Sequence, residues 1–332
     1  MENGRMYMTT LASVSQRSKC TKYIASVLVS AAYLCLCPPW NMNCNAATLM
    51  GTVSGKMDTI SHTDHQPFVV DGGLLIYPNT RKAASLSKES ILGFQCIWSA
   101  RHKWLACSRD SSCGPNVQAG IWVLRSDGRS LKSITRGADE YPSWSPDSKS
   151  IVFARIIKLP LDESGQGGIS TLRIVRIESG KEQVLFDSKT YNNCPVWSPD
   201  GRKLAFESNE SGKLRIWLMD ILSRRKWQLP NQPDGHNGYP VWSKDSKHLF
   251  VVWTDHARKR TGLYRTTISG KQLRWYRSIH PLFSRIGLSS DEKRIVMVQP
   301  FESHSLTLSE VTLQDSRRRI LMRGKWGLNP AW

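Results

Sequence analysis

One stretch decides the fold: Trp197-Ser198-Pro199-Asp200-Gly201-Arg202-Lys203-Leu204-Ala205-Phe206, in which a tryptophan precedes a polar turn and an apolar run. Close copies of this pattern are centred on Trp144 and Trp242, and weaker copies surround Trp98 and Leu288. Taking Trp332 as the start of a further copy, the tryptophan-equivalent positions are spaced by 46, 53, 45, 46 and 44 residues. A repeat of this length is typical of one β-propeller blade.

The interior of one period supports four strands. After Trp197, β-forming runs at Lys203–Glu207, Leu214–Met219 and Lys226–Leu229 are separated by turn residues, and a fourth run ends at Trp242. We therefore predict an all-β fold, a six-bladed β-propeller of four-stranded antiparallel blades. We expect the ring to be closed by strands from both termini, because mixing them in one blade hides sheet edges that would otherwise pair with other chains.

Two side chains of the repeat have predicted structural roles. The tryptophans are expected to pack between neighbouring blades, where a large ring is buried. The repeated aspartates are expected to stabilise a turn, since Asp can hydrogen-bond backbone two residues on; a ring of carboxylates for a cation is the rival interpretation. The residues concerned are Trp98, Trp144, Trp197, Trp242 and Trp332, and Asp147, Asp200, Asp245 and Asp291.

These motifs resemble the WD40-like (PD40) propeller repeat of the TolB family, over roughly residues 67–332. The resemblance implies a propeller that acts in protein interactions. Propellers of this repeat type also occur in the noncatalytic half of prolyl oligopeptidase relatives and in lyases acting on acidic sugars. TolB carries a separate α/β domain before its propeller, whereas about 20 residues separate the leader from the first strand here, and this difference argues against a role in the Tol system.

The N-terminal segment has the pattern of a signal peptide. Arg17, Lys19 and Lys22 precede an apolar run, 23–37, that is too short for a comfortable membrane span. We predict a signal peptide over 1–46, a linker over 47–66 and the propeller over 67–332. Cleavage would give an exported protein of the periplasm or cell envelope; a retained segment would act as a membrane anchor, so membrane contact is expected only in that case.

An exported protein is found where disulfides persist. Cys107 and Cys113 bracket a short polar loop, 108–112, that a bridge could close, and we predict this bond. Zinc binding by these thiols is not expected, because no CxxC pair and no histidine at ligand spacing accompanies them.

The formal net charge is +19, and residues 224–332 contain 20 basic and 8 acidic side chains. This imbalance favours anionic partners such as a glycan or lipid, with nucleic acid less favoured. Basic side chains there are interleaved with Tyr264, Trp275 and Tyr276, an arrangement that can hold phosphate or sugar rings. Strands with one solvated face show the same alternation of basic and aromatic residues without any ligand. The predicted basic surface comprises Arg258, Lys259, Arg260, Arg265, Lys271, Arg274, Arg277, Arg317, Arg318 and Arg319.

The sequence contains few signs of a catalytic site. The chain has no Gly-x-Ser-x-Gly elbow and no Gly-rich phosphate loop, so we assign no catalytic residue and no cofactor, and leave open whether it is an enzyme. Weak metal-ligand candidates are His236, His256, His280 and His304, which fall in connections between expected strands. The preferred function is a noncatalytic scaffold that binds an envelope protein. The alternatives are a lyase or hydrolase of polysaccharides at the propeller channel, and a binder of anionic polymer through the basic last third.

Overall fold

A computed structural model describes residues 68–70, 74–77, 82–85, 94–101, 103–110, 117–126, 130–160, 166–186, 189–271, 273–276, 285–289, 291–301 and 305–324. All of them belong to one structural unit, residues 42–332. The predicted signal peptide and linker lie outside the described residues. Within the described ranges every regular element is a β-strand, and no helix there is long and apolar enough to cross a membrane.

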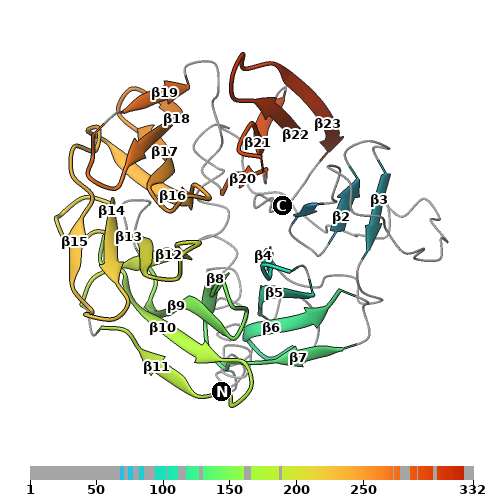
Figure 1. Ribbon diagram of the computed structural model, residues 1–332, viewed down its shortest axis with the longest axis vertical. Helices are drawn as coiled ribbons and strands as arrows, with labels where there is room; N and C mark the ends of the chain where they lie inside the picture. Colours follow the sequence, from blue (N-terminus) through green and yellow to red (C-terminus); the bar gives the residue numbers. More distant parts are fainter. Residues whose placement is uncertain are drawn as a thin grey trace, which may run out of the picture. The chain divides into compact units, whose positions relative to one another are not determined.

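The strands form five four-stranded antiparallel sheets, which are the blades, and one three-stranded sheet (Figure 1). The three-stranded sheet contains β1 (Phe68–Val70), β2 (Leu74–Tyr77) and β3 (Lys82–Ser85). The first three blades contain β4 (Phe94–Trp98), β5 (Trp104–Arg109), β6 (Gly120–Arg125) and β7 (Leu131–Ser133); β8 (Asp139–Trp144), β9 (Ser150–Lys158), β10 (Ile169–Arg176) and β11 (Glu182–Val184); β12 (Asn192–Trp197), β13 (Lys203–Ser208), β14 (Arg215–Asp220) and β15 (Lys226–Gln228). The last two contain β16 (His236–Trp242), β17 (His248–Asp255), β18 (Arg260–Thr267) and β19 (Arg274–Tyr276); β20 (Gly287–Leu288), β21 (Arg294–Phe301), β22 (Ser305–Thr312) and β23 (Arg318–Gly324).

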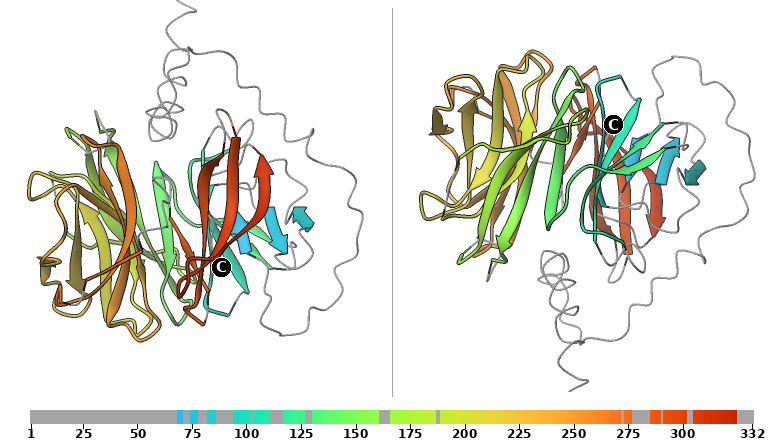
Figure 2. Two further views of the ribbon diagram at one scale, coloured as in Figure 1. Left: turned by 90° about the horizontal axis from the view of Figure 1, so that it is seen from above. Right: turned by 90° about the horizontal axis from the view of Figure 1, so that it is seen from below.

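The blades follow one another around a ring in chain order. Their first strands, β4, β8, β12, β16 and β20, lie closest to its centre in Figure 1. The view turned by 90° in Figure 2 shows the strands running through the thickness of this ring. Functional side chains at the centre therefore come from the first strands.

The predicted number of blades is wrong for the described residues: they contain five four-stranded blades, not six. The predicted phase of the blade was also shifted by one strand. The strand that ends at each repeated tryptophan, such as β16 at Trp242, is the first strand of the following blade and not the last strand of its own. The sheet of β1, β2 and β3 has three described strands. The fourth strand that we expected to close it, ending at Trp332, lies outside the described residues.

The core lies between adjacent blades. One apolar cluster joins Ala106 and Ile121 of the first blade to Ile151 and Phe153 of the second, and similar clusters join the second to the third, the third to the fourth and the fourth to the fifth. Alternating side chains of each strand supply these two faces. Because both faces of the middle blades are covered, each blade is held by its neighbours.

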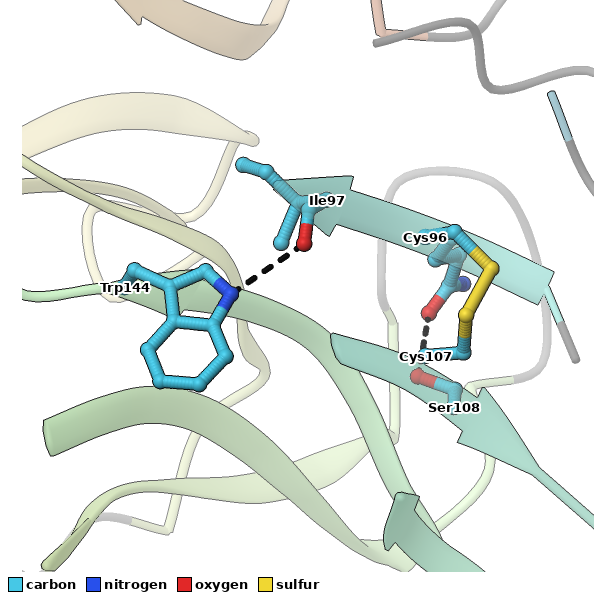
Figure 3. The surroundings of a disulfide bond; sticks show 6 residues. Cys96, Ile97, Cys107, Ser108 and Trp144 are labelled. Carbon is cyan, nitrogen blue, oxygen red and sulfur yellow. Dashed lines mark hydrogen bonds between the residues drawn. A yellow bond between two sulfur atoms is a disulfide. The ribbon is translucent and has the colours of Figure 1, made fainter. Parts of the chain in front are cut away.

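The repeated tryptophans lie at these boundaries. The indole Nε1 of Trp144 donates to the carbonyl of Ile97 at 3.1 Å, and that of Trp242 donates to the carbonyl of Val196 at 3.2 Å, in each case in the preceding blade (Figure 3 shows the first). Both rings are 6% exposed. Trp98 and Trp197 are partly exposed. These hydrogen bonds satisfy indole donors that burial would otherwise leave unpaired.

The repeated aspartates occupy one turn geometry. In the third blade, Asp200 accepts from the Ser198 hydroxyl at 2.5 Å and from the backbone N–H of Arg202 at 3.0 Å. Asp147, Asp245 and Asp291 make the equivalent pair of hydrogen bonds. Burial opposes ionisation of Asp245, but bonds from Ser243, the Lys247 N–H and His248 outweigh it and lower its pKa to about 2. The four carboxylates are thus engaged locally in their turns.

A disulfide is present, but the predicted partner was wrong: Cys107 bonds to Cys96, not to Cys113 (Figure 3). Cys113 lies outside the described residues. The antiparallel register pairs Phe94 with Ser108 and Ile97 with Ala106, with a bulge between. That register brings the two Cα atoms to 4.2 Å across β4 and β5, within reach of a bridge. The prediction rested on the two cysteines at the ends of one loop, whereas the actual partner of Cys107 lies on the neighbouring strand.

Candidate functional site

The first strands of four blades contain a β-bulge three residues before the tryptophan position. The bulge residues are Gln95, Tyr141, Cys194 and Tyr239, and each has a φ between 46° and 53°. This left-handed conformation is costly for residues other than glycine, by about 1 kcal/mol each. Bulges re-aim side chains and are common beside functional sites. In the fifth blade, Arg285 occupies the same position.

These bulge residues and their neighbours form the central cluster, which consists of Gln95, Glu140, Tyr141, Tyr191, Cys194, Glu207, Tyr239 and Arg285. Its contacts connect blades that are not adjacent in the chain. The guanidinium of Arg285 lies 5.2 Å from the ring centroid of Tyr141 and donates to the carbonyls of Pro142 and Tyr141 at 3.3 and 3.4 Å. Tyr141 and Tyr239 have their ring centroids 6.4 Å apart. Arg285 thus ties the fifth blade to the second across the centre of the ring.

Side-chain acceptors hold the bulges in place. The Gln95 side-chain oxygen accepts from the backbone N–H of Tyr141 at 2.6 Å, and the Glu207 carboxylate accepts from the backbone N–H of Tyr239 at 2.5 Å. Each bond links one blade to the next. The donors that the bulge withdraws from the strand ladder are therefore satisfied from the preceding blade.

Burial raises the pKa of both acids in the cluster. Desolvation brings the pKa of Glu140 to about 7, against a hydrogen bond from Gln95 that lowers it. Desolvation also raises the pKa of Glu207, although the Tyr239 N–H, the Cys194 thiol and Arg285 favour its charged form. Near neutral pH the Glu140 carboxyl is thus divided between its protonated and ionised forms. Glu140 is therefore a titrating group of the cluster near neutral pH.

The thiol of Cys194 and the phenols of Tyr141 and Tyr191 stay protonated. Burial raises the pKa of Cys194 well above its usual range, and the nearby Glu207 carboxyl raises it further, while Arg285 lowers it. Burial likewise raises the pKa of Tyr141 and Tyr191. A thiol is nucleophilic only as the thiolate. The cluster therefore offers hydrogen-bond donors, aromatic faces and one guanidinium, which suit recognition more than covalent catalysis.

Two of the four candidate histidines come together. The Nε2 atom of His256, directly after the end of β17, lies 2.7 Å from the Nδ1 atom of His236, the first residue of β16. His280 and His304 lie outside the described residues. In the described part of the chain, no three or more His, Cys, Asp and Glu side chains are placed to hold one metal ion. The metal-site hypothesis stays a prediction.

The basic residues divide into paired and unpaired sets. Arg258 and Arg260 share the Asp255 carboxylate at 3.0 Å, Arg317 pairs with Asp315 at 3.2 Å, and Arg319 pairs with Glu310 at 2.6 Å. Lys259, Lys271 and Arg318 are exposed. Arg265 and Arg274 lie together on β18 and β19. Arg277 lies outside the described residues. The predicted basic surface is therefore several local groups.

The sequence analysis missed the central cluster. Its signal is a variable position inside a constant motif: glutamine, tyrosine, cysteine, tyrosine and arginine occupy the place three residues before the tryptophan-equivalent position. The residue at this position changes from blade to blade, whereas the tryptophan-equivalent position is a tryptophan in four of the five described blades. Such a position is expected where side chains meet a ligand and not where they pack a repeated core.

Five antiparallel blades around a ring, four of them opened by the tryptophan motif and the fifth by its leucine variant at Leu288, define the β-propeller class of proteins. Residues 164–332 match the PD40 family, the TolB beta propeller domain, which is about half of the chain. The chain belongs to this family.

Individual relatives agree with this assignment. The Tol-Pal system protein TolB of Anaeromyxobacter dehalogenans (strain 2CP-C) is 28% identical over 140 residues, which are 40% of this chain and 30% of that protein. The crystal structure of TolB from Acinetobacter baumannii has a TM-score of 0.65 at 15% identity, covering 80% of this chain and 65% of that one. An oligogalacturonate lyase in complex with manganese has a TM-score of 0.55 at 14% identity, covering 74% and 69%. At such identities the solved structures share the fold alone.

Proposed function

We propose that this chain is a noncatalytic, TolB-like interaction scaffold of the bacterial periplasm or cell envelope, and that the central cluster contacts its protein partner. The observation that carries the proposal is the set of partly exposed tyrosines beside a guanidinium: Tyr141, Tyr191 and Tyr239 with Arg285. Tyrosine and arginine are enriched among the residues that dominate binding energy at protein interfaces.

Backbone geometry supports the same assignment. Four bulges with left-handed residues recur at the centre, and each would relax if its strand were regular. Strain of this kind persists where the surrounding structure holds it, and it clusters at ligand sites. Preorganised side chains lose little conformational entropy on binding, so a rigid aromatic cluster is a good receptor for a peptide segment.

Family membership supports the cellular setting. The matched relatives include Tol-Pal system proteins, and the chain spans between about a quarter and a third of the length of these curated relatives. The proposal therefore concerns the propeller. The signal-peptide pattern of the sequence supports export. An exported TolB-like propeller would have an envelope protein as its partner.

Site-specific photocrosslinking in the native organism tests the proposal. A benzoylphenylalanine at Tyr239 should yield one discrete crosslinked envelope protein. The same label at Leu222, which is 95% exposed on the β14–β15 turn, should yield none. A crosslink of equal yield from Leu222, or none from Tyr239, Tyr141 and Tyr191, would overturn the proposal. Turnover of a polysaccharide by the purified chain would favour an enzyme instead.

A further inference from the structure

A second site lies away from the centre, between the fourth and fifth blades. A cavity of about 200 Å³ is lined there by Arg265 and Arg274 from one blade and by Glu292, Lys293 and Leu313 from the next. The rings of Phe250 and Tyr276 form its apolar wall, stacked at 6.1 Å between centroids. Three cationic side chains thus surround the cavity with one acid.

The two arginines are direct neighbours across the strands. Arg265 on β18 is paired in register with Arg274 on β19, so their side chains leave the same face of the sheet. Both guanidinium groups lie over aromatic rings, at 5.7 Å from the Phe250 centroid and 5.3 Å from the Tyr276 centroid. Like charges directly opposite one another destabilise a sheet. An arginine does not relieve this repulsion by losing its proton.

The described residues supply no counter-charge for this pair. No carboxylate of the described ranges lies within ion-pair distance of either guanidinium, and the Nε atom of Arg265 is buried without a hydrogen-bond partner there. The one acid of the cavity, Glu292, accepts a hydrogen bond from the backbone N–H of Lys244. A buried donor without an acceptor is costly, and the two neighbouring guanidinium charges repel each other. An anion in the cavity would remove both costs.

The neighbouring blades show that the arrangement is particular to this one. At the same register positions the third blade has Leu218 and Trp227, and the fifth has Glu310 beside Arg319. Only the fourth of the five described blades puts two like charges there.

We propose that this cavity binds a small organic carboxylate with an apolar body. The planar guanidinium groups suit the two oxygens of a carboxylate. The wall formed by the Phe250 and Tyr276 rings and by Leu313 is mostly carbon, and it suits a body of a few carbon atoms. All the oxygens of phosphate need donors or water, whereas the carbon body of a monocarboxylate needs none, so the apolar wall favours the carboxylate. This site is independent of the proposed function at the centre of the ring.

Isothermal titration of the full chain with benzoate tests the assignment, with benzamide as the neutral probe of the same shape and inorganic phosphate as the second anion. We expect one benzoate site per chain, with benzamide and phosphate at least about tenfold weaker. Arg274→Gln should weaken benzoate about tenfold or more, because a charge-assisted pair is lost. Arg318→Gln, an exposed arginine of the next blade that does not line the cavity, should change it less than about twofold.

A folding check accompanies each variant. Arg274 is exposed at the outer strand, so its replacement should leave the thermal transition cooperative, and Arg274→Lys, which keeps the charge but loses the planar fork, should bind with intermediate affinity. Absence of benzoate binding, equal binding of benzamide, equal binding of phosphate, or binding unaffected by Arg274→Gln would each overturn the assignment.

Discussion

In the fourth blade two arginines lie side by side, whereas the fifth blade has a glutamate beside an arginine at the same place. The register makes the positions equivalent: Phe250 pairs with Arg265, which pairs with Arg274, and Val296 pairs with Glu310, which pairs with Arg319. In the fifth blade Glu310, 7% exposed, accepts from Arg294 at 2.9 Å and from Arg319 at 2.6 Å. The same position in the blade therefore holds an arginine pair without a counter-charge in the fourth blade and a compensated glutamate in the fifth.

The central cluster adds a third case. Glu140 has no cation among its main influences, and burial raises its pKa to about 7. A carboxyl group relieves unfavourable burial by taking up a proton, which an arginine in the opposite situation cannot imitate by losing one. The difference teaches that unmatched buried acids make pH-dependent sites, whereas unmatched arginines call for an external anion.

The largest expected loss of stability comes from removing the Glu310 carboxylate, which compensates the arginines of the fifth blade. Glu310→Gln would leave Arg294 and Arg319 without their shared carboxylate and bring the fifth blade to the condition of the fourth. We predict a loss of about 2 kcal/mol in the free energy of unfolding, because a nearly buried acceptor of two charged bonds is removed, with the arginines partly solvated. Urea unfolding measures it. The exposed Glu178→Gln should stay within about 0.5 kcal/mol, and an equally small change at Glu310 would contradict the prediction.

A smaller change, a gain in stability, is expected from placing an acid beside Arg265 in the fourth blade. Arg274→Glu places an acid across from Arg265 and copies the neighbouring blade in mirror image. We predict a gain of about 1 kcal/mol, which corresponds to a rise of about 2–4 °C in melting temperature. Thermal unfolding in low-salt buffer without organic anions measures it. Arg176→Glu, at an exposed position of β10, serves as the matched control, and a lower melting temperature for Arg274→Glu alone would oppose the account.

Another expected effect concerns the dependence of stability on pH. The folded-state pKa of Glu140 lies above its unfolded value, so folding favours the protonated form, and stability decreases as pH rises from about 4.5 to about 7 and then levels off. Glu140→Gln removes this contribution. The rise of the pKa from 4.5 to about 7 corresponds to about 3 kcal/mol, so we predict that the variant melts about 5 °C above the unaltered protein at pH 8 and at the same temperature at pH 4. Parallel melting curves of the two proteins across this range would show that Glu140 is not the titrating group.

Much of the fold could be predicted from the sequence, because the repeat places strands directly. The third blade was expected at Lys203–Glu207, Leu214–Met219 and Lys226–Leu229, and its strands β13, β14 and β15 lie within one residue of these bounds. The blade phase could not be read from the spacing, since a repeat has no intrinsic beginning. The expected pairing of Cys107 with Cys113 failed because neighbouring strands, and not loop length, bring thiols together.

Less of the candidate sites could be predicted. The basic residues Arg265 and Arg274 were singled out, but only the register of β18 and β19 shows that they oppose each other. The cluster around Tyr141 and Arg285 joins residues 144 positions apart and depends on ring closure, which local patterns do not contain. The two sites therefore required the three-dimensional arrangement of the blades.

Two double-mutant cycles test most directly the contrast between the two arginines of the fourth blade and the glutamate–arginine pair of the fifth. One cycle uses the single and double glutamine variants of Arg265 and Arg274, and the other uses those of Glu310 and Arg319. Urea unfolding without organic anions should give coupling energies of opposite sign: repulsive between the two arginines and attractive, by about 1 kcal/mol, between the glutamate and its arginine. A coupling of zero or of attractive sign for Arg265 with Arg274 would contradict the account.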